Sequence, residues 1–126
     1  MKITSTIARV LIGLMFVIFG LNGFLWFMPA PALTGPVQMF LQAVVVSHFV
    51  WFYSGVQVIS GVLLVLNRYV PLAIVVTAAV IANILAFHMA MFLAGIAPAI
   101  LVTVLWFLTA WPLRAHFSPL FVKRTA

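Results

Sequence analysis

The sequence contains no Asp, no Glu and no Cys. Without an acidic side chain, the chain has no carboxylate to act as a general base or to bind Mg²⁺ or Ca²⁺. Without cysteine, disulfides, thiol redox relays and iron–sulfur ligation are excluded. The sequence therefore predicts no catalytic residue and no metal site.

Charged residues of either sign are scarce, at 5% of the chain, whereas 67% of the 126 residues are hydrophobic. Soluble domains are nearer to half apolar and a quarter charged. Because a water-soluble fold could not cover its surface with this composition, we predict one all-α transmembrane domain over residues 1–126. We interpret the net charge of +6 as a signal of membrane orientation and contact with membrane lipids, not of nucleic-acid binding.

Four apolar segments approach the length of about 20 residues that a helix needs to cross a bilayer. We expect these helices at about residues 8–28, 49–66, 71–93 and 97–113. The fourth is short, because Pro98–Trp111 spans only about 21 Å at 1.5 Å per residue. We therefore expect it to continue through Pro112 with a kink.

Residues 37–48 are predicted to form a short interfacial helix between the first two crossings. Gln38 and Gln42 are four residues apart, so they share one face and can meet water together. The alternative is a single long, tilted helix from Val37 to Leu66. The prolines and the glycine within 29–36 end the first crossing before either arrangement begins.

The cationic residues all fall on one side of this topology: Lys2, Arg9, Arg68, Arg114, Lys123 and Arg124. The opposite connections, residues 29–48 and 94–98, carry no charge. Cytoplasmic loops are enriched in Lys and Arg, so this asymmetry places both termini in the cytoplasm. The sequence thus predicts an integral membrane four-helix bundle.

Small residues are expected at the helix contacts, because they let membrane helices approach closely. Alanine occupies every fourth position along the third crossing: Ala78, Ala82, Ala86, Ala90 and Ala94. We predict that this row lines a helix contact. Gly13 and Gly20 share a face of the first crossing with Gly23 nearby, and Gly55 and Gly61 have a looser role on the second.

Each predicted crossing carries a polar side chain at middle-to-outer depth: Asn22, Gln57, Asn83 and Thr103. Polar groups are costly in hydrocarbon, so we expect them to face the bundle interior. In one interpretation they hydrogen-bond across the bundle. In the other, Asn22, Gln57, Asn83 and His88 line a small cavity for a lipophilic ligand with polar oxygens. His88 lies about 140° around the helix from Asn83, so the two side chains cannot point at one spot.

Haem is disfavoured as a cofactor. His48 and His88 could approach each other for axial ligation, but no arginine is available on the outer side for the propionates. His48 and His116 each lie at a predicted membrane boundary, and we interpret them as interface residues.

Three segments, in this order and spacing, resemble the DoxX-like family of small bacterial four-helix membrane proteins: ARVLIGLMFVIFGLNGF (8–24), NRYVPLAIVV (67–76) and NILAFH (83–88). The resemblance implies a compact bundle in the bacterial cytoplasmic (inner) membrane and an association with quinone-linked redox complexes. The positions that match the family pattern are Asn22, Arg68, Tyr69, Pro71, Asn83 and His88. Gln57 departs from it, since the pattern leads us to expect a glutamate there. This change removes a proton acceptor.

Three functions remain open. The first, which we favour, is a non-catalytic accessory or structural subunit that binds quinone or lipid and associates with other membrane subunits or with itself. The second is a quinone-reactive oxidoreductase subunit, in which Asn83 and His88 would bind the quinone carbonyls and His88 would pass protons. The third is a small transporter, although four helices enclose little room and the sequence shows no internal repeat.

Overall fold

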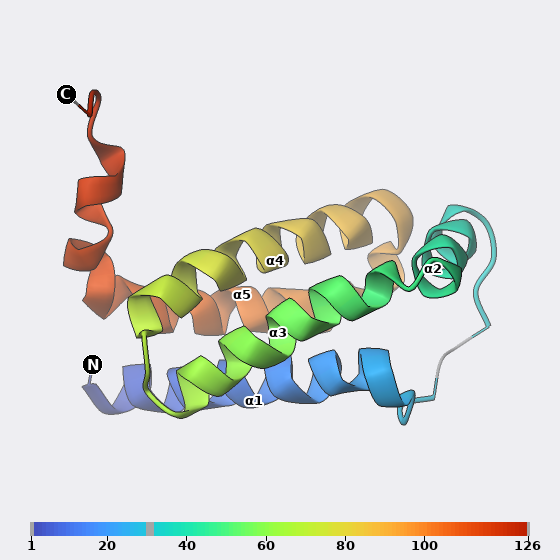
Figure 1. Ribbon diagram of the computed structural model, residues 1–126, viewed down its shortest axis with the longest axis horizontal. Coiled ribbons are helices and arrows are strands. Elements are labelled where there is room, and N and C mark those ends of the chain that lie inside the picture. The colour runs from blue at the N-terminus through green and yellow to red at the C-terminus, as the bar shows by residue number, and fades with distance from the viewer. Residues whose placement is uncertain (1, 30–31, 126) are drawn as a thin grey trace.

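The computed structural model describes residues 2–29 and 32–125, and every regular element within them is helical. In chain order these elements are α1 (Lys2–Leu25), α2 (Pro36–Val46), α3 (Phe49–Val65), α4 (Val70–Met91), the 3-10 turn η1 (Leu93–Gly95), α5 (Ile96–Ala110), and the 3-10 helices η2 (Trp111–His116) and η3 (Ser118–Phe121). This confirms the predicted all-α class. The long helices α1, α3, α4 and α5 lie side by side (Figure 1).

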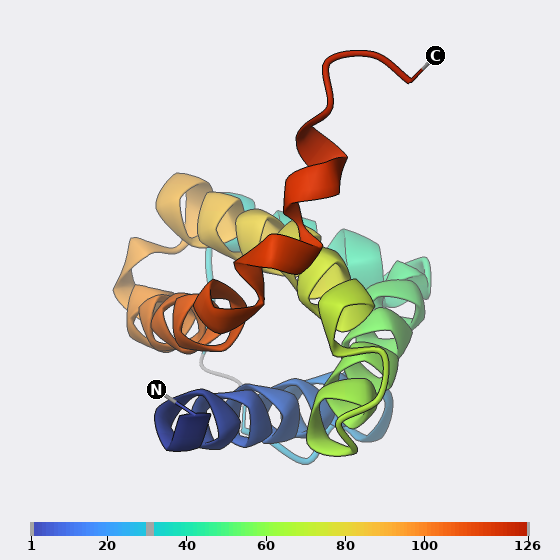
Figure 2. The same ribbon diagram turned by 90° about the vertical axis from the view of Figure 1, so that its left-hand side faces the viewer.

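The end-on view shows how these four helices contact one another (Figure 2). α1 packs against α3 and α5, and α4 packs against the same two helices from the other side. The start of α1, the α3–α4 turn and the tail that follows α5 all lie at one end of the molecule (Figure 1). The core between the helices includes Ile12, Phe16, Leu64 and Ile74, each almost fully buried.

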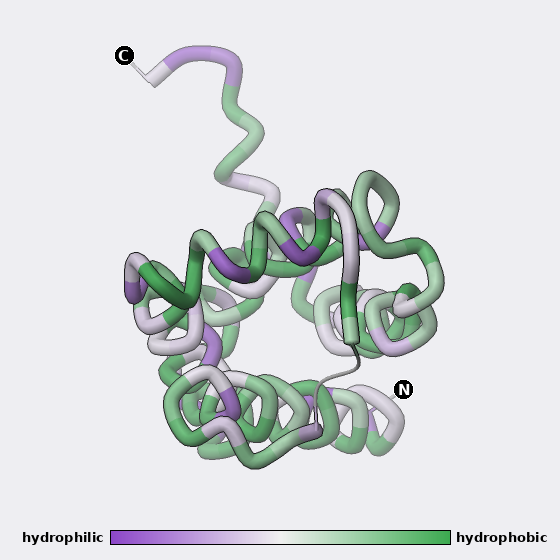
Figure 3. The backbone as a smooth tube through the Cα atoms, turned by 90° about the vertical axis from the view of Figure 1, so that its right-hand side faces the viewer, coloured by the Kyte–Doolittle hydropathy of each residue, from purple (hydrophilic) through white to green (hydrophobic). Residues whose placement is uncertain are grey.

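Three helical stretches are long and apolar enough to cross a membrane: Lys2–Leu25, Val70–Met91 and Leu93–His116. α2 and α3 pass the same criterion only as a pair, so the described chain has three or four such spans. Hydrophobic residues dominate the packed helices, and hydrophilic ones gather at the far end of the C-terminal tail (Figure 3). These features are consistent with a membrane protein.

α2 and α3 meet at a bend of 85°, which rules out one long helix from Val37 to Leu66. His48 marks the bend and has a left-handed backbone, with φ of 62°. Few residues other than glycine and asparagine adopt this conformation, and it ends the helical path. α2 instead crosses the ends of the other helices (Figure 3) as a separate short helix, with Gln38 and Gln42 both exposed.

The ends of the first helix differ from the prediction, because α1 begins six residues earlier and ends three residues earlier than 8–28. It stops where Trp26 takes a left-handed backbone, with φ of 54°. The side-chain oxygen of Asn22 then accepts a hydrogen bond of 2.8 Å from the backbone N–H of Met28. This contact satisfies the backbone N–H of Met28, which lies just beyond the end of α1.

The other predicted boundaries are closer to the structure. α3 and α4 agree with 49–66 and 71–93 to within two residues. The fourth helix does continue past Pro112, but only as the 3-10 helix η2, since α5 itself ends at Ala110. Proline lacks the N–H that an α-helix would need at this point.

Glycines let the backbones of α1 and α3 approach very closely. A Cβ atom added to Gly61 would lie 2.7 Å from the carbonyl oxygen of Gly13, and one added to Gly20 would lie 2.7 Å from Cγ2 of Val58. Such distances leave no room for any side chain. Gly55 differs, because its nearest such neighbour lies at 4.0 Å. The glycine face predicted on the first crossing is therefore confirmed.

The alanine row on α4 does not line a helix contact within the chain, so this prediction was wrong. Ala82, Ala86 and Ala90 are exposed. α4 packs instead through a set spaced by three and four residues: Val70, Ala73, Ile74, Thr77 and Ile81. A row at every fourth residue drifts by about 40° per step, so it leaves the contact face after its first member.

Among the described residues, two side chains form hydrogen bonds from one long helix to another, and neither is an amide. The indole N–H of Trp106 on α5 donates to the carbonyl oxygen of Ile74 on α4, at 3.0 Å. The Arg9 guanidinium on α1 donates to the carbonyl oxygens of Leu64 and, at 3.5 Å, Val65 at the end of α3. Arg9 thus has a packing role between α1 and α3.

Candidate ligand-binding site

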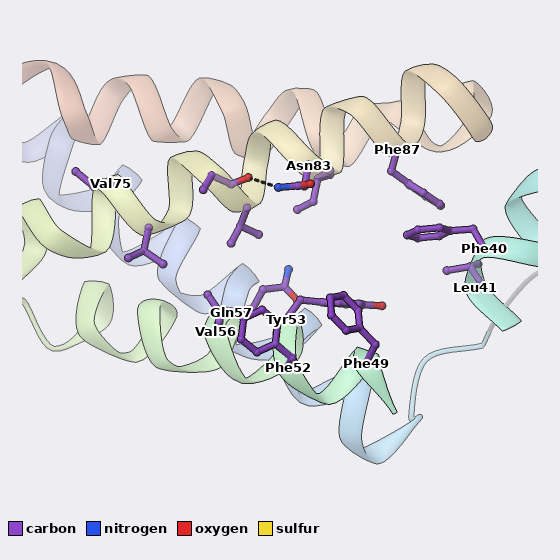
Figure 4. A pocket seen from close by; sticks show the side chains of 14 residues that line it. Phe40, Leu41, Phe49, Phe52, Tyr53, Val56, Gln57, Val75, Asn83 and Phe87 are labelled. Carbon is purple, nitrogen blue, oxygen red and sulfur yellow. Dashed lines mark hydrogen bonds between the residues drawn. The ribbon is translucent and has the colours of Figure 1, made fainter. Parts of the chain in front are cut away.

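A groove of about 690 Å³ lies between α3 and α4 and is bounded at one end by α2 (Figure 4). Pockets for small ligands in proteins typically measure about 300–1,000 Å³. Five of the 14 lining side chains are aromatic: Phe40, Phe49, Phe52, Tyr53 and Phe87. None of the lining side chains carries a charge. The groove is therefore suited to one uncharged, largely apolar molecule.

Gln57 is the most buried polar side chain of this groove, with 9% of its surface exposed. Figure 4 shows its amide directed from α3 into the groove, and no described residue hydrogen-bonds to it. Every fully shielded polar side-chain atom of the described residues has a partner, so the Gln57 amide is reachable from the groove. An unmet amide in apolar surroundings costs about 1–3 kcal/mol, which a ligand oxygen can recover.

Asn83 lies across the groove on α4 (Figure 4). Its Nδ2 donates a hydrogen bond of 2.9 Å to the carbonyl oxygen of Ala79 on the same helix. One of its two N–H groups is thus used, and Oδ1 stays available as an acceptor. Asn83 is exposed on the groove wall, which differs from the prediction that all polar side chains face the interior. The hydrogen bond to Ala79 lowers the free-energy cost of placing this amide in apolar surroundings.

Tyr53 contributes a third polar group that the sequence analysis did not single out. It lines the groove one helical turn before Gln57. Residues at i and i+4 share a helix face, so this spacing was a signal that could have identified it. Together, the Tyr53 hydroxyl and the two amides provide both hydrogen-bond donors and acceptors along an apolar groove.

The other two predicted site residues lie elsewhere. Asn22 is engaged at the end of α1, where it accepts from Met28. The Nδ1–H of His88 donates to the carbonyl oxygen of Ile84 at 2.8 Å, and the His88 ring packs edge-on against Phe87 at 5.0 Å. Neither residue lines the groove. The structure therefore brings Gln57 and Asn83 together and leaves Asn22 and His88 apart from them.

Hydrogen bonds do not support the interpretation in which the polar residues join the helices. The Thr103 hydroxyl donates to Ala99 on its own helix, at 2.7 Å. Thr109 does the same with Leu105, at 2.8 Å. These side chains satisfy their own helix backbone, so they add no bond between helices.

An aromatic contact fixes the α2 end of the groove. Phe40 of α2 packs against Phe87 of α4, with ring centroids 5.4 Å apart (Figure 4). Tilted ring pairs at this distance are favourable, so the contact holds α2 across the end of the groove. The described residues contain no group of three or more side chains that could hold a metal ion.

No protein-family model, curated protein or solved structure matches this chain. The resemblance to the DoxX-like family thus stays a prediction. The groove carries the Gln57 amide on its α3 wall and the Asn83 amide on its α4 wall, with apolar side chains between them.

Proposed function

We propose that this chain is a non-catalytic accessory subunit of a larger membrane complex, and that it holds one uncharged lipophilic molecule, a quinone or a lipid, in the α3–α4 groove. The observation that carries the proposal is Gln57, a residue only 9% exposed whose side-chain amide opens into the groove without a hydrogen-bond partner among the described residues. A ligand carbonyl or hydroxyl oxygen would satisfy this amide. The surrounding aromatic and aliphatic side chains would hold the rest of the molecule.

We place the protein in the bacterial cytoplasmic membrane as a four-helix bundle of the DoxX-like type, with both termini cytoplasmic. The charge distribution supports this orientation, because the segments that carry the six cationic residues share one end of the molecule (Figure 1). α2, which lies across the opposite end, would then rest in the outer interface with its exposed glutamines toward water.

The polar groups of the groove fit both ligand classes. The Gln57 amide can donate to a quinone carbonyl or to an ester or hydroxyl oxygen, and Asn83 Oδ1 can accept from a hydroxyl. A bound quinone would supply the redox chemistry, while the chain would supply binding and orientation. Because the groove has no cationic lining residue, it does not favour an anionic headgroup.

The position of His88 supports an accessory role over a quinone-reactive one. In the quinone-reactive alternative His88 binds the ligand and passes protons, yet it lies outside the groove lining and its Nδ1–H is engaged with Ile84. The groove also lacks a carboxylate, because the chain has none. Binding a ligand requires only hydrogen-bonding and apolar side chains, whereas proton transfer also requires a titratable group within reach of the ligand.

The direct test is Gln57→Leu, which keeps the size of the side chain and removes its hydrogen-bonding groups. We expect the molecule that copurifies with the wild-type protein to fall about tenfold in this variant, since one lost hydrogen bond of about 1.4 kcal/mol changes affinity by that factor. Mass spectrometry of the organic extract would identify and quantify the molecule.

Gln38→Leu is the matched control, because Gln38 is an exposed glutamine on α2 that does not line the groove. Its ligand content should equal that of the wild-type protein. Equal retention of quinone or lipid in both variants would remove the basis for the site.

A further inference from the structure

A second groove, of about 320 Å³, lies between α4, α5 and the C-terminal tail. It shares only Val75 with the first groove. Its lining is apolar apart from one residue, Arg114, and includes Trp106, Trp111 and Phe117. An acyl chain fits such a lining, whereas a polar ligand would lose its hydration without compensation.

Arg114 is held in a defined position beside this groove. Its guanidinium lies 4.8 Å from the ring centroid of Trp111 and donates a hydrogen bond of 2.8 Å to the carbonyl oxygen of the same residue. A guanidinium has five N–H donors, so most of them remain free. No Asp or Glu exists in the chain to pair with it. Its free donors are therefore available to an anion from outside the protein.

The tail that closes the groove turns away from the axis of α5 (Figure 2). Leu120 and Phe121 in η3 are 64% and 81% exposed, and Lys123 and Arg124 follow after Val122. Large apolar side chains next to cations are typical of segments that lie in the interface of an anionic membrane. The tail and the second groove thus both place apolar side chains next to cationic ones.

We propose that this second groove binds one anionic glycerophospholipid, with an acyl chain along Trp106 and Phe117 and the phosphate at the Arg114 guanidinium. The inference uses the membrane location proposed above but does not depend on the ligand of the α3–α4 groove. Charge complementarity selects this occupant, since a zwitterionic or neutral lipid would leave the arginine without a net counter-charge. An acidic peptide or a nucleic acid would leave the apolar groove unfilled.

The two tryptophans of the groove allow a direct test in the full-length protein. Replacing Trp26 and Trp51 by Phe leaves Trp106 and Trp111 as the only indole reporters. The protein is reconstituted in phosphatidylcholine vesicles that contain a fixed fraction of phosphatidylglycerol or phosphatidylcholine with brominated acyl chains. Bromine quenches only the fluorescence of indoles that it contacts. We expect phosphatidylglycerol to bind about fivefold more tightly than phosphatidylcholine, as one cation near a membrane surface typically provides.

Arg114→Gln should reduce this preference to about one, whereas Arg114→Lys should retain most of it. Arg68→Gln is the matched control, because Arg68 does not line the groove, and it should leave the preference unchanged. Equal quenching by the two lipids in the reference protein, or a preference that survives in Arg114→Gln, would overturn the inference. If neither lipid quenches, the membrane location fails as well. Gln57→Leu should leave the preference for phosphatidylglycerol unchanged, because Gln57 does not line the second groove. A negative result for the proposed ligand of the first groove can therefore be told apart from a negative result here.

Discussion

Gly61→Ala is expected to destabilise the protein by about 2–3 kcal/mol, the upper range for overpacking a closely packed site. The new Cβ atom would lie 2.7 Å from the carbonyl oxygen of Gly13 and 2.9 Å from the backbone nitrogen of Val17. Both are backbone atoms of α1, so relief requires the two helices to move apart. Denaturation by sodium dodecyl sulfate, followed by circular dichroism in a mild detergent, measures the loss.

Gly55→Ala is the control on the same helix. Its nearest neighbour across the interface, a ring carbon of Phe24, lies at 4.0 Å, which is ordinary contact. Since alanine is a better helix former than glycine by about 0.5–1 kcal/mol, this variant should be as stable as the wild-type protein or more stable. If both variants lose the same stability, close contact between α1 and α3 is not what these glycines provide.

Arg9→Met should lower the free energy of unfolding by about 2 kcal/mol. The guanidinium donates to Leu64 and Val65 at the carboxyl-terminal end of α3, where the helix dipole also favours a cation. Hydrogen bonds that involve a charged group contribute about 1.5–3 kcal/mol. Methionine keeps much of the apolar stem, so the measured difference reports mainly on the lost bonds and charge.

Arg68→Met separates this packing role from the effect of charge on topology. Arg68 is exposed in the α3–α4 turn, and surface changes of this kind usually alter stability by less than about 0.5 kcal/mol. The same denaturation assay applies to both variants. A loss in Arg68→Met that matched the loss in Arg9→Met would show that net charge, and not the contact with α3, sets the stability.

The long helices could be predicted because their signal is local. Apolar length marks α1, α4 and α5, and the proline at position 71 marks the start of α4 within one residue. The angular separation of Asn83 and His88 also follows from helix geometry alone, and the structure places only Asn83 in the groove. The spacing thus argued against a common site for these two residues, although the sequence analysis kept both as candidates for one.

The errors concern which face of a helix meets which neighbour. α4 carries apolar residues on every side, so hydrophobic periodicity does not select its contact face, and the alanine row was misleading for that reason. The left-handed backbone of His48 also has no signal in the sequence, because histidine seldom adopts this conformation. The placement of Gln57 and Asn83 in one groove required knowing that α3 and α4 lie next to each other.

α2 and the C-terminal tail turn away from the helix axes at opposite ends of the molecule (Figure 1). In a bilayer, these two segments would lie in opposite interfaces and limit the tilt of the bundle as a whole. The 17 residues of α3 measure only about 25 Å, against a hydrocarbon thickness of about 30 Å. Since a helix shorter than the hydrocarbon layer is accommodated by local thinning of the bilayer, lipids with shorter chains should gather around α3 beside the mouth of the first groove.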